Sequence, residues 1–257
     1  MTVFNPQSIV NFRDCGGYRT RSGMIMRRGR LFRSGQLTHA APADLKRLAA
    51  LGIKTVVDLR RSAERADGRV SWPDGVSVET IFRNDGGDAL PPHLMAFVEA
   101  GGSVEAAREA MLRIYRAIPF DPMIADLTGA LIGRLCDGEE AVLVHCAAGK
   151  DRTGFVVAFI HILLEIEPED WREHYLLSHE ACLADPHSLK RMQEALGRPG
   201  RMAKDEAVRV VLSALPEFLE TALQSVRERC GSIERYARET IGISPDMHSA
   251  LRRTLLR

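Results

Sequence analysis

The sequence predicts an α/β fold with a mostly parallel central sheet and helices on both faces. Three apolar runs, IKTVVDLR, VSVETIF and AVLVHC, are typical of buried strands. Segments with apolar residues at helical spacing lie between these runs, and strands that alternate with helices favour a parallel sheet. At 257 residues, 45% of them hydrophobic, the chain is long enough to bury a large core. We expect a single domain over residues 1–257.

The remaining elements follow in order along the chain. CGGYRTRSGM predicts a hairpin between short strands, because its glycines suit tight turns. APADLKRLAALG predicts a short helix that has Pro42 near its start and Gly52 at its end. Residues 88–137 predict two or three helices, and TGFVVAFIHILLEI predicts a long buried one. After Pro168 the pattern is helical, with breaks near PHS, GRPG and ISPD.

The bulk properties exclude several classes of protein. A formal net charge of +1 argues against nucleic-acid binding by a broadly basic surface. No apolar run approaches the length of a membrane span, and the N-terminus lacks the pattern of a signal peptide. Five scattered cysteines without a C-x-x-C pair are typical of a reducing compartment. We expect a cytoplasmic protein, although leaderless secretion would leave no trace, and the oligomeric state stays open.

The stretch HCAAGKDRTG, residues 145–154, combines several features of an anion-binding loop. It lies between a strand and a helix, where loop amides and the positive end of the helix dipole can bind an oxyanion. The fork of Arg152 can hold two oxygens of a phosphoryl group. The same positive field favours the thiolate form of Cys146, which is the nucleophilic form. We expect Cys146 to attack phosphorus and water to cleave the thiophosphoryl intermediate, without a metal or another cofactor.

The other residues of this region have expected roles too. Phosphate contacts are expected from Ala147, Ala148, Gly149, Lys150, Asp151 and Arg152. His145 is expected to hydrogen-bond the loop rather than to act as an acid or base, and Thr153 is expected to support it. Arg13 and Asp14 in NFRDCGGY and Arg33 in LFRSG either brace the pocket or are simple turn residues.

At these residues the chain resembles a known family. HCAAGKDRTG has the C-x5-R pattern of protein tyrosine phosphatases. NFRDCGGY, GRLFRSGQL, VVDLRRSAE, YLLSHE and GSIERYARETIGIS are similar, in the same order, to the bacterial group of mycobacterial tyrosine phosphatase B and related phosphoinositide phosphatases. The resemblance runs from about residue 8 to the end, with one departure at Cys15. It implies the cysteine phosphatase fold with extra C-terminal helices, and residues 186–215 are a candidate lid or helical insertion.

The leaving oxygen needs a proton, so a carboxylic acid should lie near it. The resemblance implies that Asp151, in the loop itself, can take this role. Asp58, at the carboxyl end of VVDLR, is a second candidate, either as the acid or as an ion-pair partner that orients Arg152. Asp74 follows a Trp-Pro pair, but there it fits an ordinary turn better. Asp85, on a Gly-rich stretch, is a further alternative.

Lys150 bears on the choice of substrate. The resemblance implies that Gly-Lys-Asp-Arg accompanies activity on phosphoinositides as well as phosphotyrosine, and sometimes on phosphoserine and phosphothreonine. A second cation suits a ligand with several phosphates, whereas a lysine that points to solvent would have no such meaning. We therefore expect phosphorylated proteins or phosphoinositides as partners. Two other functions stay open: a phosphate-recognition module without turnover, and a rhodanese-like sulfurtransferase.

Overall fold

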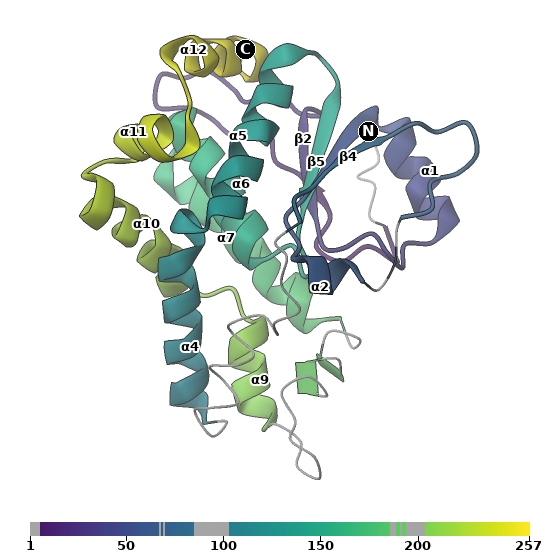
Figure 1. Cartoon of the computed structure of the whole chain (residues 1–257), viewed down its shortest axis with the longest axis vertical. Helices are drawn as coiled ribbons and strands as arrows, with labels where there is room; N and C mark the ends of the chain where they lie inside the picture. The colour runs from purple at the N-terminus through teal and green to yellow at the C-terminus, as the bar shows by residue number, and fades with distance from the viewer. Residues whose placement is uncertain are drawn as a thin grey trace.

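The centre of the molecule is a five-stranded sheet with the order β1-β2-β5-β3-β4 (Figure 1). The computed structural model describes residues 6–66, 68, 70–84, 103–185, 189–190, 192–193 and 204–257. The strands are β1 (Arg13–Asp14), β2 (Leu31–Ser34), β3 (Ile53–Asp58), β4 (Glu79–Ile81) and β5 (Ala141–His145). Only β1 pairs in an antiparallel way, so the expected mostly parallel sheet is confirmed.

Helices cover both faces of this sheet, as expected. They are α1 (Pro42–Ala50), α2 (Ser62–Arg65), α4 (Val104–Ala117), α5 (Pro122–Asp137), α6 (Asp151–Leu163), α7 (Pro168–Leu183), α9 (Asp205–Leu212), α10 (Pro216–Cys230), α11 (Ile233–Tyr236) and α12 (Pro245–Leu255). A 3-10 turn spans Ile118–Phe120 and a π-helical turn spans Ala237–Ile241. In Figure 1, α1 lies on one side of the sheet and α5, α6 and α7 lie on the other.

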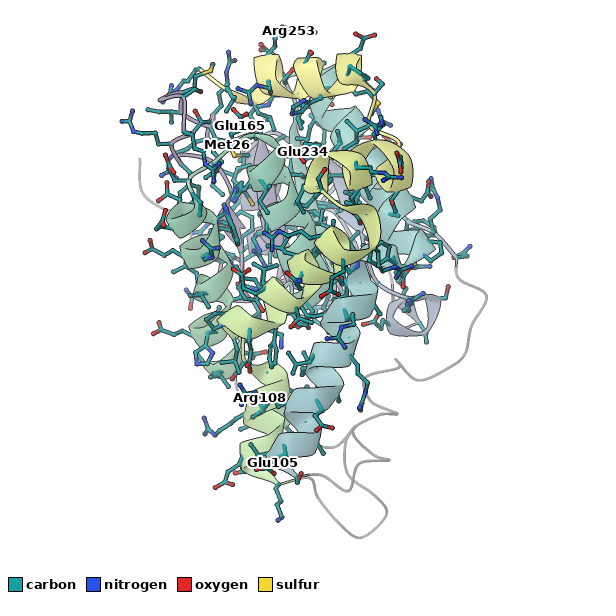
Figure 2. The ribbon with its side chains drawn as sticks, turned by 90° about the vertical axis from the view of Figure 1, so that its left-hand side faces the viewer. Met26, Glu105, Arg108, Glu165, Glu234 and Arg253 are labelled. Carbon is teal, nitrogen blue, oxygen red and sulfur yellow. The ribbon has the colours of Figure 1, made fainter. Side chains whose placement is uncertain are left out.

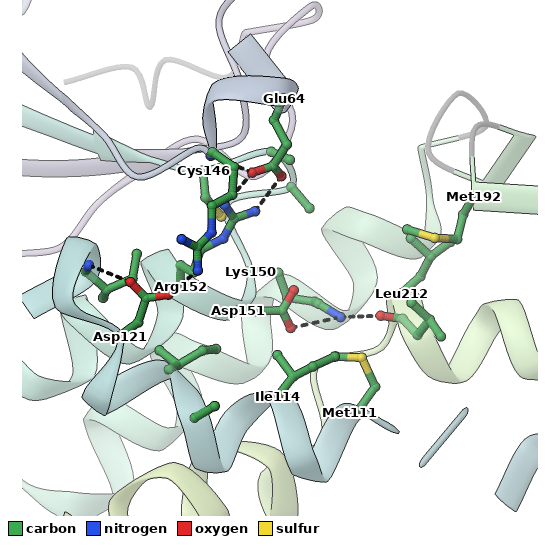
Figure 3. Close-up of a pocket in the computed structure, with 17 residues that line it drawn as sticks. Glu64, Met111, Ile114, Asp121, Cys146, Lys150, Asp151, Arg152, Met192 and Leu212 are labelled. Carbon is green, nitrogen blue, oxygen red and sulfur yellow. Dashed lines mark hydrogen bonds and ion pairs between the residues drawn. The ribbon is translucent and has the colours of Figure 1, made fainter. Parts of the chain in front are cut away.

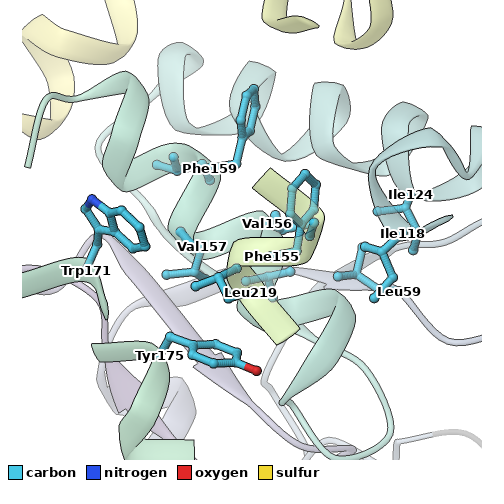
Figure 4. Packing of buried hydrophobic residues seen from close by; sticks show 14 of the residues in the cluster. Leu59, Ile118, Ile124, Phe155, Val156, Val157, Phe159, Trp171, Tyr175 and Leu219 are labelled. Atoms are coloured by element: carbon cyan, nitrogen blue, oxygen red, sulfur yellow. The ribbon is translucent and has the colours of Figure 1, made fainter. Parts of the chain in front are cut away.

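The buried side chains of the sheet divide between two hydrophobic clusters, because successive residues of a strand point to opposite faces. Val56 of β3 packs with α1 in the smaller cluster, and its neighbour Val57 lies in the larger cluster with α5, α6 and α10. Nearly every residue of α6 is buried, and Phe155 and Phe159 stack with their ring centroids 6.3 Å apart (Figure 4). The helix that follows Cys146 is therefore fixed on all sides.

The strands differ from the sequence prediction in two places. β4 is shorter than VSVETIF, because this edge strand has exposed or half-exposed residues and little core to cover. LFRS forms β2, which the sequence analysis did not predict as a strand, since four residues are too few to show a period. The predicted hairpin is confirmed by the bridge between Arg19 and Ile25.

The predicted helices are confirmed where the structure describes them. α4 and α5 account for the later part of residues 88–137, and residues 85–102 lie outside the described residues. The breaks at PHS and GRPG also lie outside them, whereas ISPD does separate two helical segments. In Figure 2 the ends of α4 and α9 form the lower end of the molecule, where Arg108 Nε of α4 pairs with Glu217 Oε1 at 2.7 Å. In the described ranges, no helix is both long and apolar enough to cross a membrane.

Candidate active site

A tight loop joins β5 to α6 and contains the C-x5-R sequence. Cys146 follows the last residue of β5 and is only 2% exposed, and α6 begins at Asp151. Gly149 has a φ of +67°, and a Cβ atom there would lie 2.2 Å from the carbonyl oxygen of Ser34 in β2. Because only glycine tolerates both conditions, Gly149 lets the loop close against β2.

Hydrogen bonds from neighbouring segments hold the outer carbonyl groups of the loop. Gln36 N donates to Ala147 O at 2.9 Å. Asn11 Nδ2 donates to Gly149 O at 2.8 Å, and Arg33 Nη2 donates to the same oxygen at 2.6 Å. In a trans peptide the N–H points opposite to the C=O. When a carbonyl group is held on the outside of the loop, the N–H of the next residue therefore points to the inside. The loop can therefore present several N–H groups to one anion.

Arg152 lies in the first turn of α6, and two partners orient its guanidinium, of which Figure 3 shows Glu64. Its Nη1 and Nη2 atoms each donate to one carboxylate oxygen of Glu64 at 2.6 Å, and Nη1 also donates to Leu59 O at 3.0 Å. Burial alone would lower the pKa of Arg152, but the Glu64 carboxylate outweighs burial and the pKa is raised. Arg152 therefore stays charged and still has N–H groups for a phosphate.

A cavity of about 170 Å³ adjoins this loop. Figure 3 shows Cys146, Lys150, Asp151 and Arg152 among the residues that line it. Ala147 and Ala148 of the loop also line it. The rest of the lining comes from α2, α4, α5, α9 and the segments beside them: Arg61, Glu64, Met111, Ile114, Ala117, Ile118, Asp121, Ile124, Met192, Val211 and Leu212. The wall opposite the loop is mostly apolar, so it suits an apolar or aromatic part of a ligand.

Lys150 and Asp151 lie in this cavity with partners already in place. Asp151 Oδ1 accepts a hydrogen bond from the Tyr115 hydroxyl at 2.7 Å and lies 3.2 Å from Lys150 Nζ. Lys150 is 2% exposed, and its ammonium donates to the carbonyl oxygens of Val211 and, at 3.0 Å, Ser213. These carbonyls belong to the carboxyl end of α9, the negative end of its dipole. Lys150 therefore links the loop to α9 and does not point to solvent.

Comparisons with known proteins agree with this geometry. A family model described as "Tyrosine phosphatase family" matches residues 4–257. The chain is 30% identical over 241 residues to a "Putative tyrosine-protein phosphatase" of Cupriavidus necator, covering 92% of this chain and 83% of that protein. It is 32% identical over 278 residues to the triple specificity protein phosphatase PtpB of Mycobacterium tuberculosis, covering 96% of each chain.

The chain belongs to the tyrosine phosphatase family. It is a cysteine-dependent protein-tyrosine phosphatase, so a sulfurtransferase and a recognition module without turnover are the less favoured functions. The family match concerns the whole chain and does not by itself assign a role to any single residue. The positions of the individual site residues come from the geometry.

Asp58 has a different position in this phosphatase from the one expected. Its carboxylate pairs with Arg60, whose Nη2 lies 2.8 Å from Oδ2, and both side chains are 3% exposed. Among the described residues, the cavity lining does not include Asp58, and the carboxylate that orients Arg152 is Glu64. The chain folds back directly after β3, so Arg60 reaches the carboxylate that was expected to reach Arg152.

The other predicted residues divide into neighbours of the loop and residues away from it. His145 Nδ1 lies 3.1 Å from Cys146 O, in accordance with its expected contact with the loop, and burial lowers its pKa, so it is neutral. Thr153 is fully buried in the first turn of α6. Asp74 lies in an exposed turn before Gly75, which has a φ of +77°, and Asp85 lies outside the described residues.

Sequence reasoning missed three residues that shape the site. Glu64 lies in VVDLRRSAE, where a carboxylate soon after a strand could have suggested a partner for Arg152. Tyr115 lies on the apolar face of α4 and gives only the signal of a core residue. Asn11 has a φ of +61°, a conformation that Asn tolerates better than most residues, and the sequence gives no sign of its contact with the loop.

Proposed function

We propose that Cys146 is the nucleophile of this phosphatase and that the loop amides and Arg152 bind the transferred phosphoryl group. The Cys146 thiolate bonds to phosphorus while the bond from phosphorus to the leaving oxygen breaks. The amides and Arg152 stabilise the charge on the equatorial oxygens. Water then attacks phosphorus, the sulfur–phosphorus bond breaks and phosphate leaves. The observation that carries the proposal is that Cys146 and Arg152 line one cavity at the start of α6.

Asp151 is the general acid of the proposed mechanism. Its carboxyl group lines the same cavity as Cys146 and accepts a hydrogen bond from the Tyr115 hydroxyl. Asp151 would protonate the leaving oxygen and later accept a proton from the attacking water. Asp151→Asn should slow alkyl phosphates by about 100-fold and activated aryl phosphates much less, because the latter need no proton. If Asp58→Asn gives this pattern instead, the acid is Asp58.

The substrates extend from phosphotyrosine to phosphoserine, phosphothreonine and phosphoinositides in this proposal. The apolar wall formed by Met111 and Ile114 of α4 suits an aromatic ring or an aliphatic group next to the phosphate. Triple specificity in the name of the mycobacterial relative supports the wider range. Lys150 would have to leave the carbonyls of Val211 and Ser213 to reach a second phosphate, and α9 would then lose this anchor.

Loss of this anchor would let α9 move, and we therefore give residues 186–215 the role of a lid. Within that range the structure describes α9, whose Val211 and Leu212 line the cavity. Removal of α9 from the cavity would expose Cys146 to larger substrates. The single-domain organisation and the cytoplasmic location stay predictions.

The test measures phosphate release from a phosphotyrosine peptide, a phosphoserine peptide and phosphoinositide vesicles, without added metal. Cys146→Ser should abolish release from every substrate. Cys182→Ser is the matched control, because Cys182 Sγ lies 3.7 Å from Ala148 O and this thiol is not on the cavity lining. Release by Cys146→Ser near the wild-type rate would contradict the assignment of the nucleophile. Release from the peptides alone would remove the lipids from the substrate range.

A further inference from the structure

Arg33 lies against the C-x5-R loop, and the half-buried Arg13 lies beside it; neither is among the residues that line the cavity. Arg33 of β2 is fully buried, and its Nη2 donates to Gly149 O at 2.6 Å and to Ser178 Oγ at 3.2 Å. Arg13 Nη2 donates to the same Ser178 Oγ at 2.9 Å. A Cβ atom on Gly154 would lie 3.5 Å from Arg33 Nη2, so this guanidinium also lies against the first turn of α6. The two guanidinium groups thus share one hydroxyl behind the loop.

Neither arginine pairs with a carboxylate in the described residues. Their hydrogen bonds go to carbonyl, hydroxyl and side-chain amide oxygens. Three nitrogen atoms of these guanidinium groups, Nε of Arg13 and both Nε and Nη1 of Arg33, are buried and have no hydrogen-bond partner among the described residues. A buried charge is strongly unfavourable unless a negative group compensates it. Such a group should therefore lie nearby.

The thiols and imidazoles around the two arginines do not supply this negative charge. Burial raises the pKa of Cys15 to about 12 and that of Cys182 to about 11, so both thiols are protonated at neutral pH. Burial, helped by the arginine charges, lowers the pKa of His161 to about 4 and that of His174 well below its ordinary value. Both imidazoles are therefore neutral.

The carboxylates in the vicinity are used elsewhere. Asp14 accepts hydrogen bonds from the amides of Gly16 and Gly29, each at 2.7 Å. Asp151 lies beside Lys150, on the cavity side of the loop. Arg33 itself contacts the loop at Gly149 O, 2.6 Å from its Nη2 atom. Because Arg33 holds the loop at Gly149 O, an anion bound inside the loop is the next negative group that its charge can stabilise.

We propose that Arg33 is a positioning residue that, together with Arg13, gives the reverse side of the loop a positive charge and stabilises the anion held inside it. This anion is the Cys146 thiolate before the reaction and the phosphoryl group during it. Arg33 acts through the Gly149 carbonyl, which it holds, and through its field, which a low-dielectric interior screens little. The proposal rests on the assignment of Cys146 as the nucleophile.

The test compares alkylation of Cys146 by iodoacetate, an anion, with alkylation by iodoacetamide, its neutral analogue. Both reagents form a sulfur–carbon bond and release iodide, and peptide mapping identifies the modified cysteine. A positive loop favours the anion, so the ratio of the two rates reports its field. Arg33→Gln should lower this ratio about tenfold relative to wild type. Arg33→Lys, which keeps the charge, should stay within about threefold of wild type.

Ser178→Ala is the structural control, because it removes the hydroxyl shared by Arg13 and Arg33 and leaves both charges in place. Its ratio should match that of wild type. An unchanged ratio in Arg33→Gln, or an equal fall in Arg33→Lys, overturns the proposal. If Arg33→Gln does not fold, the same ratio is compared between Arg13→Gln, in which it should fall, and Arg13→Lys, in which it should stay near the wild-type value. Phosphatase activity in Cys146→Ser would overturn the assignment of the nucleophile. The alkylation ratio tests only the effect of Arg33, so failure of the inference and failure of the proposed function can be distinguished.

Discussion

At the scale of single residues, Glu64 sets the direction of Arg152. Its two carboxylate oxygens take both terminal nitrogens of the guanidinium in a planar, bidentate pair, while Leu59 O fixes one of them from the side. Such a pair gives geometric specificity as well as energy. Glu64 also accepts the amide of Arg61 at the start of α2. This short helix therefore joins Arg152 to the end of β3.

Glu64→Gln should lower kcat/KM for a phosphotyrosine peptide by about 10- to 100-fold, because Arg152 loses its fixed orientation. The loss should appear in kcat as well as KM, since one guanidinium serves both substrate and transition state. Glu217→Gln is the matched control, because it breaks a bidentate pair with Arg108 at the surface, outside the cavity lining. Equal kinetics in the two variants would show that Glu64 does not position Arg152.

At the scale of elements, the catalytic loop depends on its close approach to β2. Gly149 lies so close to β2 that a Cβ atom on it would be only 2.2 Å from the carbonyl oxygen of Ser34. By contrast, Gly133 in α5 has nothing within 4 Å of the position of a Cβ atom. Substitution of each glycine by alanine therefore compares a position where a methyl group clashes with β2 and a position where it does not.

Gly149→Ala should abolish activity and lower the melting temperature, because the loop must move away from β2 and also loses a favourable backbone conformation. Gly133→Ala should raise the free energy of unfolding by about 0.5–1 kcal/mol and leave kcat/KM unchanged, because alanine suits a helix interior better than glycine. Thermal unfolding and phosphatase assays on both variants check this. Normal activity in Gly149→Ala would contradict the geometry of the loop.

The attachment of α9 is a second feature at this scale. Lys150→Met keeps the length of the side chain and removes the ammonium that holds the carbonyls of Val211 and Ser213. Hydrogen exchange should become faster in the amides of α9 and stay slow in β5, because only α9 loses an anchor. The ratio of lipid to peptide activity should fall, since the second cation is lost. Unchanged exchange in α9 would show that apolar packing alone holds this helix.

At the scale of the whole molecule, neutral buried histidines make stability depend on pH. Burial lowers the pKa of His145, His161 and His174, and that of His161 falls to about 4. An unfolded histidine binds a proton near pH 6.5. Between about pH 6.5 and 4 the unfolded chain therefore binds more protons than the native one, so the free energy of unfolding falls as pH falls.

Urea unfolding should show this loss between pH 7.5 and 5, and His161 alone would contribute about 3 kcal/mol by pH 4. His161→Gln should flatten the dependence on pH, even if it lowers stability at pH 7.5. His39→Gln, at an exposed histidine, should leave the slope unchanged. A wild-type stability that does not change over this range would contradict the neutral state of the buried histidines.

The sequence by itself determined the class of fold and the position of the C-x5-R loop. Periodicity is a local property, so β3, β5, α1 and the buried α6 could be read from their own residues. The C-x5-R loop is also local, because its residues are neighbours in the chain. The position of β2 was not readable, since four residues show no period and a central place in the sheet depends on β5.

Only the tertiary structure decided which distant residues serve that loop. Glu64 rather than Asp58 reaches Arg152, because the turn after β3 places Arg60 on Asp58. Lys150 binds the end of α9, and Arg33 and Asn11 hold Gly149 from segments more than 100 residues away in the chain. Each of these contacts depends on where two separate elements pack. A sequence pattern describes one element at a time and therefore gives no sign of them.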